Sequence, residues 1–256
     1  MFPTKLIETL QTCQHLTVLT GAGVSAESGI PTFRDALTGF WENYDPASLA
    51  SEMGFLADPA FVWGWYEWRR QRVMQALPNT AHIALADLAT KIPKLTLITQ
   101  NVDDLHERAG STEVIHLHGS LHQPRCIACE EPYTLPEPQD PDNPMPLTEQ
   151  RLEPPRCPCC NGTIRPGVVW FGEALPVAAW EQAVTASLDC DLFLLVGTSG
   201  VIWPAANLPY KASQKNTTII QVNAESTDFD RVATYNLTGK AGVILPRLYA
   251  AAFGDE

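Results

Sequence analysis

Short runs of apolar residues that end in polar or glycine-containing turns recur along the chain. Each run is apolar throughout, which is typical of strands in a parallel sheet covered on both faces. Segments with helical patterns separate several of the runs, so we expect an α/β fold with a Rossmann-like, doubly wound parallel sheet. The expected strands are Leu16–Thr20, Leu95–Ile98, Leu192–Val196 and Thr217–Val222.

Three segments have the spacing of helices, at residues 4–13, 55–76 and 80–90. The first places its apolar residues on one face, and the second is rich in aromatic residues. In a doubly wound sheet, ligands bind beyond the carboxyl ends of the strands. The turns after the four strands should therefore converge on one edge of a cleft. These turns are Gly21–Gly23, Gln100–Asp103, Gly197–Ser199 and Asn223–Glu225.

The pattern changes between about residue 120 and residue 165, where apolar periodicity fades and proline becomes dense. Cys126 and Cys129 form one C-x-x-C unit, and Cys157 and Cys160 form another. Four thiolates at this spacing predict one tetrahedral zinc ion, and four sulfur ligands leave no open position for catalysis. We expect a structural zinc module. Cys159 could replace a neighbour as ligand, although the C-x-x-C spacing favours Cys157 and Cys160.

Composition narrows the classes of partner. The chain has 256 residues and a formal net charge of −12, so it should not bind nucleic acid through the phosphates. No apolar run is long enough to cross a membrane, and the first residues lack the apolar core of a signal peptide. We expect a cytoplasmic protein that is a monomer and binds neither nucleic acid nor membranes.

The glycine turn Gly21-Ala22-Gly23 continues to Ala26 as a G-x-G-x-x-A pattern directly after a strand. Such a turn lets backbone N–H groups approach a pyrophosphate, but glycine turns occur in many α/β folds. The acidic residue expected about twenty positions later in a dehydrogenase is not clearly present. The turn alone is therefore compatible with a nucleotide-binding site and with an ordinary glycine turn of an α/β fold.

His116 and His118 follow the β-like run Glu113–Ile115, and strand alternation puts both on one face. His118 lies at the end of this strand before a glycine, and its ordinary pKa near neutrality suits a general base. In the turn Gln100–Asp103, amide and carboxylate groups could bind ribose hydroxyls or a carboxamide. They could also cap the helical stretch Leu105–Ala109, and both roles can hold at once.

Together these motifs resemble the sirtuin family from about residue 15 to residue 248. Gly21–Arg34 looks like its NAD-binding signature, and Gln100–Asp103 like its nicotinamide-pocket motif. His118-Gly119 is similar to the catalytic motif, and Val168–Glu173 to the strand that binds the substrate. The turns at residues 197 and 223 resemble the adenine and ribose motifs, and the four cysteines fit the family's zinc module.

The resemblance implies a division of the chain into three parts. A Rossmann-like NAD-binding domain would comprise residues 1–35, 77–118 and 166–256. Residues 36–76 would form the helical and cofactor-loop part of a small domain, and residues 119–165 its zinc-binding module.

The resemblance also implies NAD and one structural zinc ion as cofactors, and proteins carrying acylated lysine as substrates. His118, Asn101 and Asp103 would be catalytic. The implied NAD-binding residues are Gly21, Ala22, Gly23, Ser25, Ala26, Thr32, Phe33, Arg34, Gln100, Asn101, Asp103, Gly197, Thr198, Ser199, Asn223, Ala224, Glu225 and Ala241. The implied substrate residues are Ala36, Tyr66, Arg69, Val168, Val169, Phe171, Gly172 and Glu173.

The activity implied is NAD-dependent removal of acyl groups from lysine. The acyl oxygen would attack the ribose C1′ and expel nicotinamide. His118 would then act as general base toward a ribose hydroxyl, and free lysine and O-acyl-ADP-ribose would result.

Tyr66 and Arg69 are three residues apart, so they share a face of a helix. They resemble the Tyr-x-x-Arg pair of the sirtuin branch that accepts succinyl and malonyl groups, and Ala36 resembles the small residue that widens the pocket of that branch. A buried carboxylate needs a charged donor, for which arginine is well suited. Alternatively, Arg69 belongs to a solvated basic face with Arg70 and Arg72. Deacetylation is expected in either case.

Three other functions compete with deacylation. An NAD-dependent protein ADP-ribosyltransferase shares the cleavage of NAD, and the substrate-strand motif Val168–Glu173 argues against it. A non-catalytic NAD sensor or zinc-mediated interaction module has no need of His118, Asn101 and Asp103. A nicotinamide dehydrogenase would need a ribose-binding acid that the sequence does not reveal.

Overall fold

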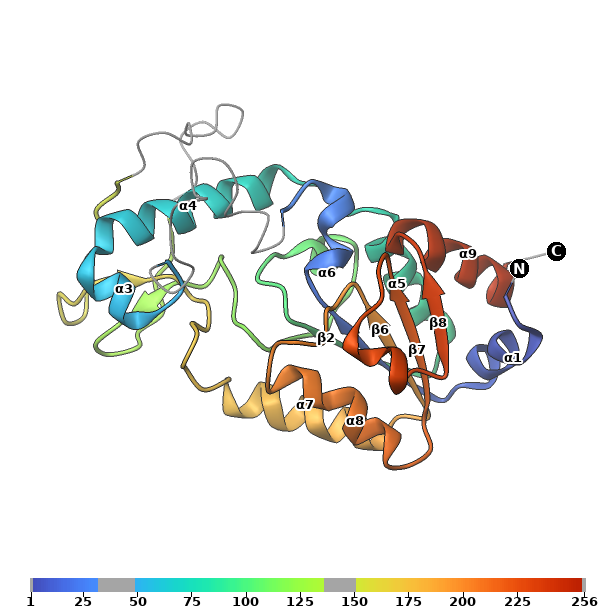
Figure 1. Cartoon of the computed structure of the whole chain (residues 1–256). Helices are drawn as coiled ribbons and strands as arrows, with labels where there is room; N and C mark the ends of the chain where they lie inside the picture. Colours follow the sequence, from blue (N-terminus) through green and yellow to red (C-terminus); the bar gives the residue numbers. More distant parts are fainter. Residues whose placement is uncertain (1, 32–48, 136–150, 255–256) are drawn as a thin grey trace.

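A computed structural model describes residues 2–31, 49–135 and 151–254. Its centre is a six-stranded sheet in which all neighbouring strands are parallel, with the order β3-β2-β1-β6-β7-β8 (Figure 1). This is the Rossmann strand order, and the predicted doubly wound α/β class is confirmed. The strands are β1 (His15–Thr20), β2 (Lys94–Thr99), β3 (Val114–His116), β6 (Leu192–Val196), β7 (Thr218–Asn223) and β8 (Tyr235–Thr238).

The order of strands reverses between β1 and β6. From β1 the chain proceeds to β2 and β3 on one side, and it then returns to β6 on the other side of β1. In register, Thr20 lies beside Thr99 of β2 and Val196 of β6. The turns that follow these three strands therefore start side by side, at the position where doubly wound sheets bind ligands.

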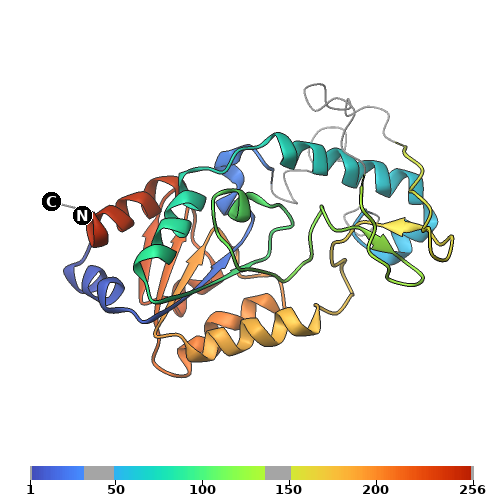
Figure 2. The same cartoon turned by 180° about the vertical axis from the view of Figure 1, so that it is seen from behind.

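Helices cover both faces of the sheet, as Figures 1 and 2 show from opposite sides. One core lies between the sheet and α1, α5 and α9, and a second lies between the sheet and α7 and α8. All residues of β1 and β6 are buried, which is why both read as continuous apolar or small segments. The helices are α1 (Thr4–Thr12), α5 (Thr80–Lys91), α7 (Val177–Asp189), α8 (Leu208–Ser213) and α9 (Ala241–Phe253).

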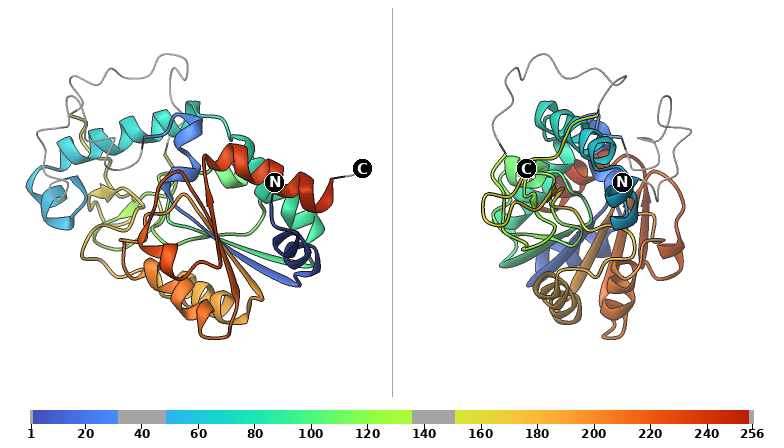
Figure 3. Two further views of the ribbon diagram at one scale, coloured as in Figure 1. Left: turned by 45° about the vertical axis from the view of Figure 1, so that its right-hand side comes forward. Right: turned by 90° about the vertical axis from the view of Figure 1, so that its left-hand side faces the viewer.

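A separate part of the molecule lies beyond the carboxyl ends of the strands (Figure 3). It contains α3 (Glu52–Ala57), α4 (Pro59–Gln75) and the antiparallel pair β4 (Arg125–Cys126) and β5 (Ile164–Arg165). These elements share a third core, to which α4 contributes mainly aromatic residues. The helical segment and the cysteine segment, distant in sequence, therefore fold on one another.

The single helix predicted over residues 55–76 is wrong in one respect, because it is broken at Asp58. The carboxylate of Asp58 accepts a hydrogen bond from the backbone N–H of Phe61 at 3.2 Å, and Pro59 begins α4. Asp58 thus caps the start of α4, and proline fits the first turn of a helix because its missing N–H is not needed there. None of the helices in the described ranges is both long and apolar enough to span a membrane.

Candidate active site

Two glycine turns meet at the point where the strand order reverses. The backbone N–H of Gly23 donates to the carbonyl of Gly197 at 2.9 Å, and that of Gly21 donates to the carbonyl of Val196 at 3.0 Å. A Cβ on Gly23 would lie 2.7 Å from Cα of Gly197, and Gly197 itself has a φ of +60°. Only glycine permits this approach and this backbone conformation. The two turns therefore pack backbone against backbone at this point.

Ser25 lies at the centre of a buried polar cluster. Its Oγ donates to Oδ2 of Asp103 and accepts from Nδ2 of Asn101, both at 3.0 Å. All three side chains are at most 7% exposed. Burial raises the pKa of Asp103, while hydrogen bonds from Leu105 and Ser25 oppose the rise. The structure therefore brings the predicted residues of the glycine turn and of the turn after β2 into direct contact.

His82 supports this cluster from α5. The backbone N–H of Asn79 donates to Nδ1 of His82 at 3.2 Å, so the neutral ring carries its proton on Nε2. Nε2 lies 3.4 Å from Oγ of Ser25. Ser25 therefore accepts from His82 and Asn101, and it gives its only proton to Asp103.

His118 is held in one tautomer by the turn after β2. Its Nδ1 lies 2.9 Å from the carbonyl oxygen of Gln100. A carbonyl only accepts, so Nδ1 carries the proton and Nε2 keeps its lone pair. Burial lowers the pKa of His118, against a smaller opposing effect of the Gln100 carbonyl. At neutral pH the imidazole is therefore an uncharged base.

The segment predicted to bind substrate runs beside His118. Val169 donates its backbone N–H to the carbonyl of His118 at 2.9 Å, and Gly119 and Val168 form an antiparallel bridge. Phe171 is more than half exposed, and Gly172 has a φ of +88°. The segment thus places its backbone next to the base.

Glu173 turns away from this path and closes the end of the segment. Its carboxylate accepts from the backbone N–H of Trp170 at 2.7 Å and forms a bidentate pair with Arg165. The guanidinium of Arg165 also stacks on the Trp170 ring, with Cζ 3.6 Å from the centroid. Although burial acts to raise it, the contacts with Arg165 and Trp170 lower the pKa of Glu173. These contacts support a role for Glu173 in shaping the turn.

Tyr66 and Arg69 come from α4, which packs on the same segment. Nε1 of Trp170 donates to Oη of Tyr66 at 3.1 Å. Burial raises the pKa of Tyr66 to about 12, while the charge of Arg69 acts in the opposite direction. Arg69 is half-buried with its Cζ 4.9 Å above the Trp65 ring, and Arg70 is buried against Glu67. A continuous solvated basic face is thus absent from this part of α4.

The turns after β6 and β7 join the same edge of the sheet. Gln100 donates from Nε2 to Oγ1 of Thr198 at 2.8 Å, and Asn223 donates from Nδ2 to the carbonyl of Thr198 at 3.2 Å. At the start of α9, Gly242 donates its backbone N–H to the carboxylate of Glu27. Ser199, Ala224 and Glu225 are exposed, and Ala241 is buried. Four of the predicted residues, Thr32, Phe33, Arg34 and Ala36, lie outside the described residues.

The four predicted cysteine ligands come together at the end of β4 and before β5. Their Sγ atoms all lie within 4.8 Å of one another. The pairs Cys126–Cys160 and Cys129–Cys160 are 3.4 Å apart, and Cys129–Cys157 is 3.7 Å apart. Tetrahedral zinc with Zn–S bonds of about 2.3 Å requires S···S edges of roughly 3.8 Å. The cluster fits zinc, and it does so without Cys159.

The comparisons with known proteins agree with this geometry. The model of the Sir2 family matches residues 21–204, which is more than half of the chain. The chain belongs to this family, the sirtuins. A protein of Methylococcus capsulatus named NAD-dependent protein deacylase is 60% identical over 250 residues, covering 98% of this chain and 97% of that protein.

Further relatives of this sirtuin include a Pseudomonas aeruginosa protein named NAD-dependent protein deacylase 1. It is 53% identical, and the match covers 97% of this chain and 98% of that protein. A crystal structure of a Sir2 homolog–NAD complex aligns with a TM-score of 0.88 at 43% identity, covering 98% of this chain and 94% of that one.

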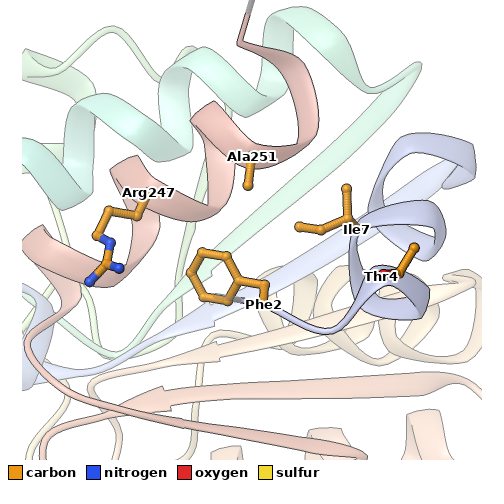
Figure 4. A pocket seen from close by; sticks show the side chains of 5 residues that line it. All are labelled: Phe2, Thr4, Ile7, Arg247 and Ala251. Atoms are coloured by element: carbon orange, nitrogen blue, oxygen red, sulfur yellow. The ribbon is translucent and has the colours of Figure 1, made fainter.

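Several residues that contact the site of this sirtuin were not foreseen. His82, Arg165 and Trp170 each bind a predicted residue. The contacts of His82 and Trp170 join segments far apart in the chain, whereas Arg165 lies 8 positions before Glu173. Trp170 lies inside the Val168–Glu173 motif. A buried indole N–H usually has a hydrogen-bond acceptor, and this was the feature of the sequence that could have indicated a contact. A shallow surface pocket between α1 and α9, lined by Phe2, Thr4, Ile7, Arg247 and Ala251, contains none of the predicted site residues (Figure 4).

Proposed function

We propose that this chain is an NAD-dependent protein deacylase that transfers acyl groups from lysine side chains to ADP-ribose. The observation that carries the proposal is His118, an uncharged base fixed by Gln100 and hydrogen-bonded through its backbone to the segment at Val169. The close relatives named deacylases support the same activity over nearly the whole chain.

The residues present fit NAD as the cosubstrate. Backbone groups of the turns at Gly21 and Gly197 would hold its phosphates, and the buried cluster of Ser25, Asn101 and Asp103 would hold the nicotinamide end. When bound, NAD supplies an activated ribose C1′ with nicotinamide as leaving group. The remaining NAD-binding assignments, including those of Thr32, Phe33 and Arg34, stay predictions.

His118 provides the proton transfer. Its Nε2 would take the proton of a ribose hydroxyl, so that the hydroxyl oxygen can attack the acyl carbon. Asn101 and Asp103 would orient the cosubstrate through the Ser25 network. One water molecule would then be consumed to release the amine, and the products would be free lysine, nicotinamide and O-acyl-ADP-ribose.

The substrates would be acylated lysines presented by protein segments that pair with Val168–Phe171. Tyr66 and Arg69 would bind a carboxylate at the end of a succinyl or malonyl group, while acetyl-lysine would also be accepted. The zinc ion would hold residues 119–165 in place and take no part in the reaction. The division into 1–35, 77–118 and 166–256, then 36–76, then 119–165 stays a prediction. The third core joins α3 and α4 to Cys126, Cys157 and Ile164, which supports grouping the last two parts, and it also includes Ile30, Leu105, Val168 and Trp170 of the first part.

The test is NAD-dependent release of acyl groups from one peptide that carries either acetyl-lysine or succinyl-lysine. Wild type, His118→Ala and His15→Gln are compared. His15 lies at the other end of β1 and contacts Thr96, so its variant should retain activity. Loss of turnover in His118→Ala alone, with NAD still bound, is expected. Consumption of NAD with ADP-ribose transferred to protein, and no acyl release, would favour the ADP-ribosyltransferase instead.

A further inference from the structure

The indole of Trp170 and the phenol of Tyr66 meet in the buried core between α4 and the substrate segment. Nε1 of Trp170 lies 3.1 Å from Oη of Tyr66, and the two side chains are 2% and 4% exposed. An indole N–H can only donate, so the hydroxyl of Tyr66 is the acceptor in this bond. Among the residues that the structure describes, Trp170 is the one group that hydrogen-bonds this hydroxyl.

This contact determines what the phenol can offer to a third group. A phenol has one proton and two lone pairs, and Trp170 occupies one lone pair. The charge of Arg69 also acts on Tyr66, and a guanidinium has only donors. Neither neighbour can take the proton of Tyr66. The proton of the Tyr66 hydroxyl is therefore left for a group outside these three side chains.

Trp170 itself is held firmly. The Arg165 guanidinium lies 3.6 Å from its ring centroid, and the ring of Phe55 packs with a centroid distance of 5.3 Å. Its backbone N–H is fixed by the carboxylate of Glu173 at 2.7 Å. The indole N–H therefore keeps its direction, and so does the hydroxyl that it binds.

We propose that Trp170 is a positioning residue for substrate specificity, which orients the Tyr66 hydroxyl as a donor so that the acyl pocket selects groups ending in a carboxylate. Trp170 can act in this way only if Tyr66 and Arg69 bind the acyl group, as proposed above. A carboxylate is acceptor-only and matches a pocket end made of donors. A carboxamide brings two N–H donors, for which this pocket end offers only the second lone pair of Tyr66, because Trp170 occupies the first.

The experiment compares three peptides that differ only in the acyl group on lysine: acetyl, succinyl, and succinamyl, in which a carboxamide replaces the terminal carboxylate. Wild type should prefer succinyl over succinamyl. Trp170→Phe keeps an aromatic ring but removes the N–H. It should lower kcat/KM for succinyl-lysine by about fivefold to tenfold, mainly through KM, with acetyl-lysine changed by less than about twofold. The preference for succinyl over succinamyl should shrink, because Tyr66 regains a lone pair for the amide.

A double-mutant comparison tests whether Trp170 acts through Tyr66. Once Tyr66→Phe has removed the hydroxyl, adding Trp170→Phe should cause little further loss on succinyl-lysine. Trp180→Phe, a partly buried tryptophan of α7 in another core, is the matched control and should leave the acyl preference unchanged. The proposal would be overturned if the fold losses in kcat/KM of the two single variants multiplied in the double variant. An equal loss of kcat/KM on all three peptides would also overturn it.

Binding measurements separate this proposal from the proposed function. Calorimetric affinities of the succinyl and succinamyl peptides need no turnover, so the Trp170 effect can be measured even in an inactive enzyme. If wild-type enzyme removes acetyl groups but does not discriminate between the succinyl and succinamyl peptides, the role of Trp170 is refuted and the deacylase function is not. If the two peptides bind with different affinity but no acyl group is released, the deacylase function is refuted and the role of Trp170 is supported.

Discussion

Nδ1 of His118 donates to the carbonyl oxygen of Gln100 at 2.9 Å, so the base of the site and the turn after β2 are fixed by one hydrogen bond. This bond decides which ring nitrogen is basic. It also places Nε2 on the side away from Gln100, where a substrate proton can be accepted. His118 therefore already has the tautomer that the proposed general base needs.

Replacing His118 by alanine should lower kcat by about 10²-fold to 10⁴-fold, the contribution typical of general base catalysis. Thermal unfolding should stay close to wild type, and NAD should still raise the melting temperature. Because burial lowers the pKa of His118, its neutral form persists below the usual value of about 6.5. The kcat/KM of wild type should fall only as the pH drops through this lowered pKa. A fall in kcat/KM that already begins above pH 6.5 as the pH is lowered would contradict the role of His118 as general base.

His116 makes the same kind of contact one residue further along the turn. Its Nδ1 lies 3.3 Å from the carbonyl of Asn101, and its Nε2 lies 2.6 Å from Oε1 of Glu107. Both partners are acceptors, so both ring nitrogens carry protons and the ring is an imidazolium. Burial opposes this charge, but Glu107 and the Asn101 carbonyl raise the pKa of His116 above its usual value, helped by the charge of Asp103.

The free energy of unfolding should therefore contain a contribution from His116 that is present at low pH. It is lost as the pH rises through the raised pKa, because the folded state then gives up its extra proton. His116→Gln should cost about 1 kcal/mol at neutral pH and remove this pH dependence. Denaturant unfolding at a series of pH values above 6.5 measures both effects. Glu107→Gln is the matched control, which should flatten the same pH range; a curve parallel to wild type in both variants would refute the imidazolium. His106 also faces this ring and titrates at lower pH.

His82 and His106 predict the opposite behaviour in acid. Their rings pack with centroids 4.9 Å apart in the buried interior. Burial lowers the pKa of His82 to about 4, and burial together with the charge of His82 lowers that of His106 to about 3. The unfolded chain binds these protons near pH 6.5, so stability should fall below that pH by about 1.4 kcal/mol per pH unit for each histidine. His106→Leu should remove one histidine's share of this slope. Equal slopes in wild type and variant, measured by denaturant unfolding between neutral and acid pH, would show that His106 is not buried uncharged.

Much of the sheet could be predicted because its signal is local. β1, β2, β6 and β7 lie within one residue of their predicted bounds. β1 and β6 are buried throughout, and β2 and β7 are buried over at least half their length, which leaves a recognisable run in each. β8 was missed because burial alternates along Tyr235–Thr238 at the edge of the sheet. The break at Asp58 was missed because the apolar pattern continues across it, while only the capping side chain marks the new start.

The site was predicted as motifs, and its internal contacts were not. The sequence places Ser25, Asn101 and Asp103 in two turns that should converge, and they do. The sequence does not show which group donates and which accepts in each hydrogen bond, because this depends on partners such as His82 and Trp170. These lie 57 and 104 positions from Ser25 and Tyr66. Periodicity reports which face of an element is buried, whereas hydrogen-bond partners across elements follow from packing.

The contact between the glycine turns predicts a strict requirement for glycine. In Gly23→Ala, the new Cβ would meet the backbone of Gly197 at 2.7 Å. The turns would have to separate, which should cost about 1–3 kcal/mol and weaken NAD binding. Gly29→Asn is the control. Gly29 has a φ of +80°, which asparagine tolerates, and a Cβ added there would have no atom within 4 Å. Thermal unfolding with and without NAD measures both effects. A Gly23→Ala protein as stable as wild type would show that the two turns need not touch.

The zinc centre makes a prediction that separates its ligands from their neighbour. Cys157→Ser removes one of four thiolates, while Cys159→Ser changes an exposed side chain outside the cluster. Zinc content, measured by elemental analysis after dialysis, should fall in the first variant and stay near one ion per chain in the second.

Gly162 adds a steric test, because a Cβ there would lie 2.9 Å from Sγ of Cys126 and 3.2 Å from Sγ of Cys160. Gly162→Ala should therefore weaken zinc binding with all four ligands intact. We expect the metal to hold β4 and β5 against α4, so chelation should lower activity together with thermal stability. Full activity in metal-free protein would mean that the third core folds without the ion.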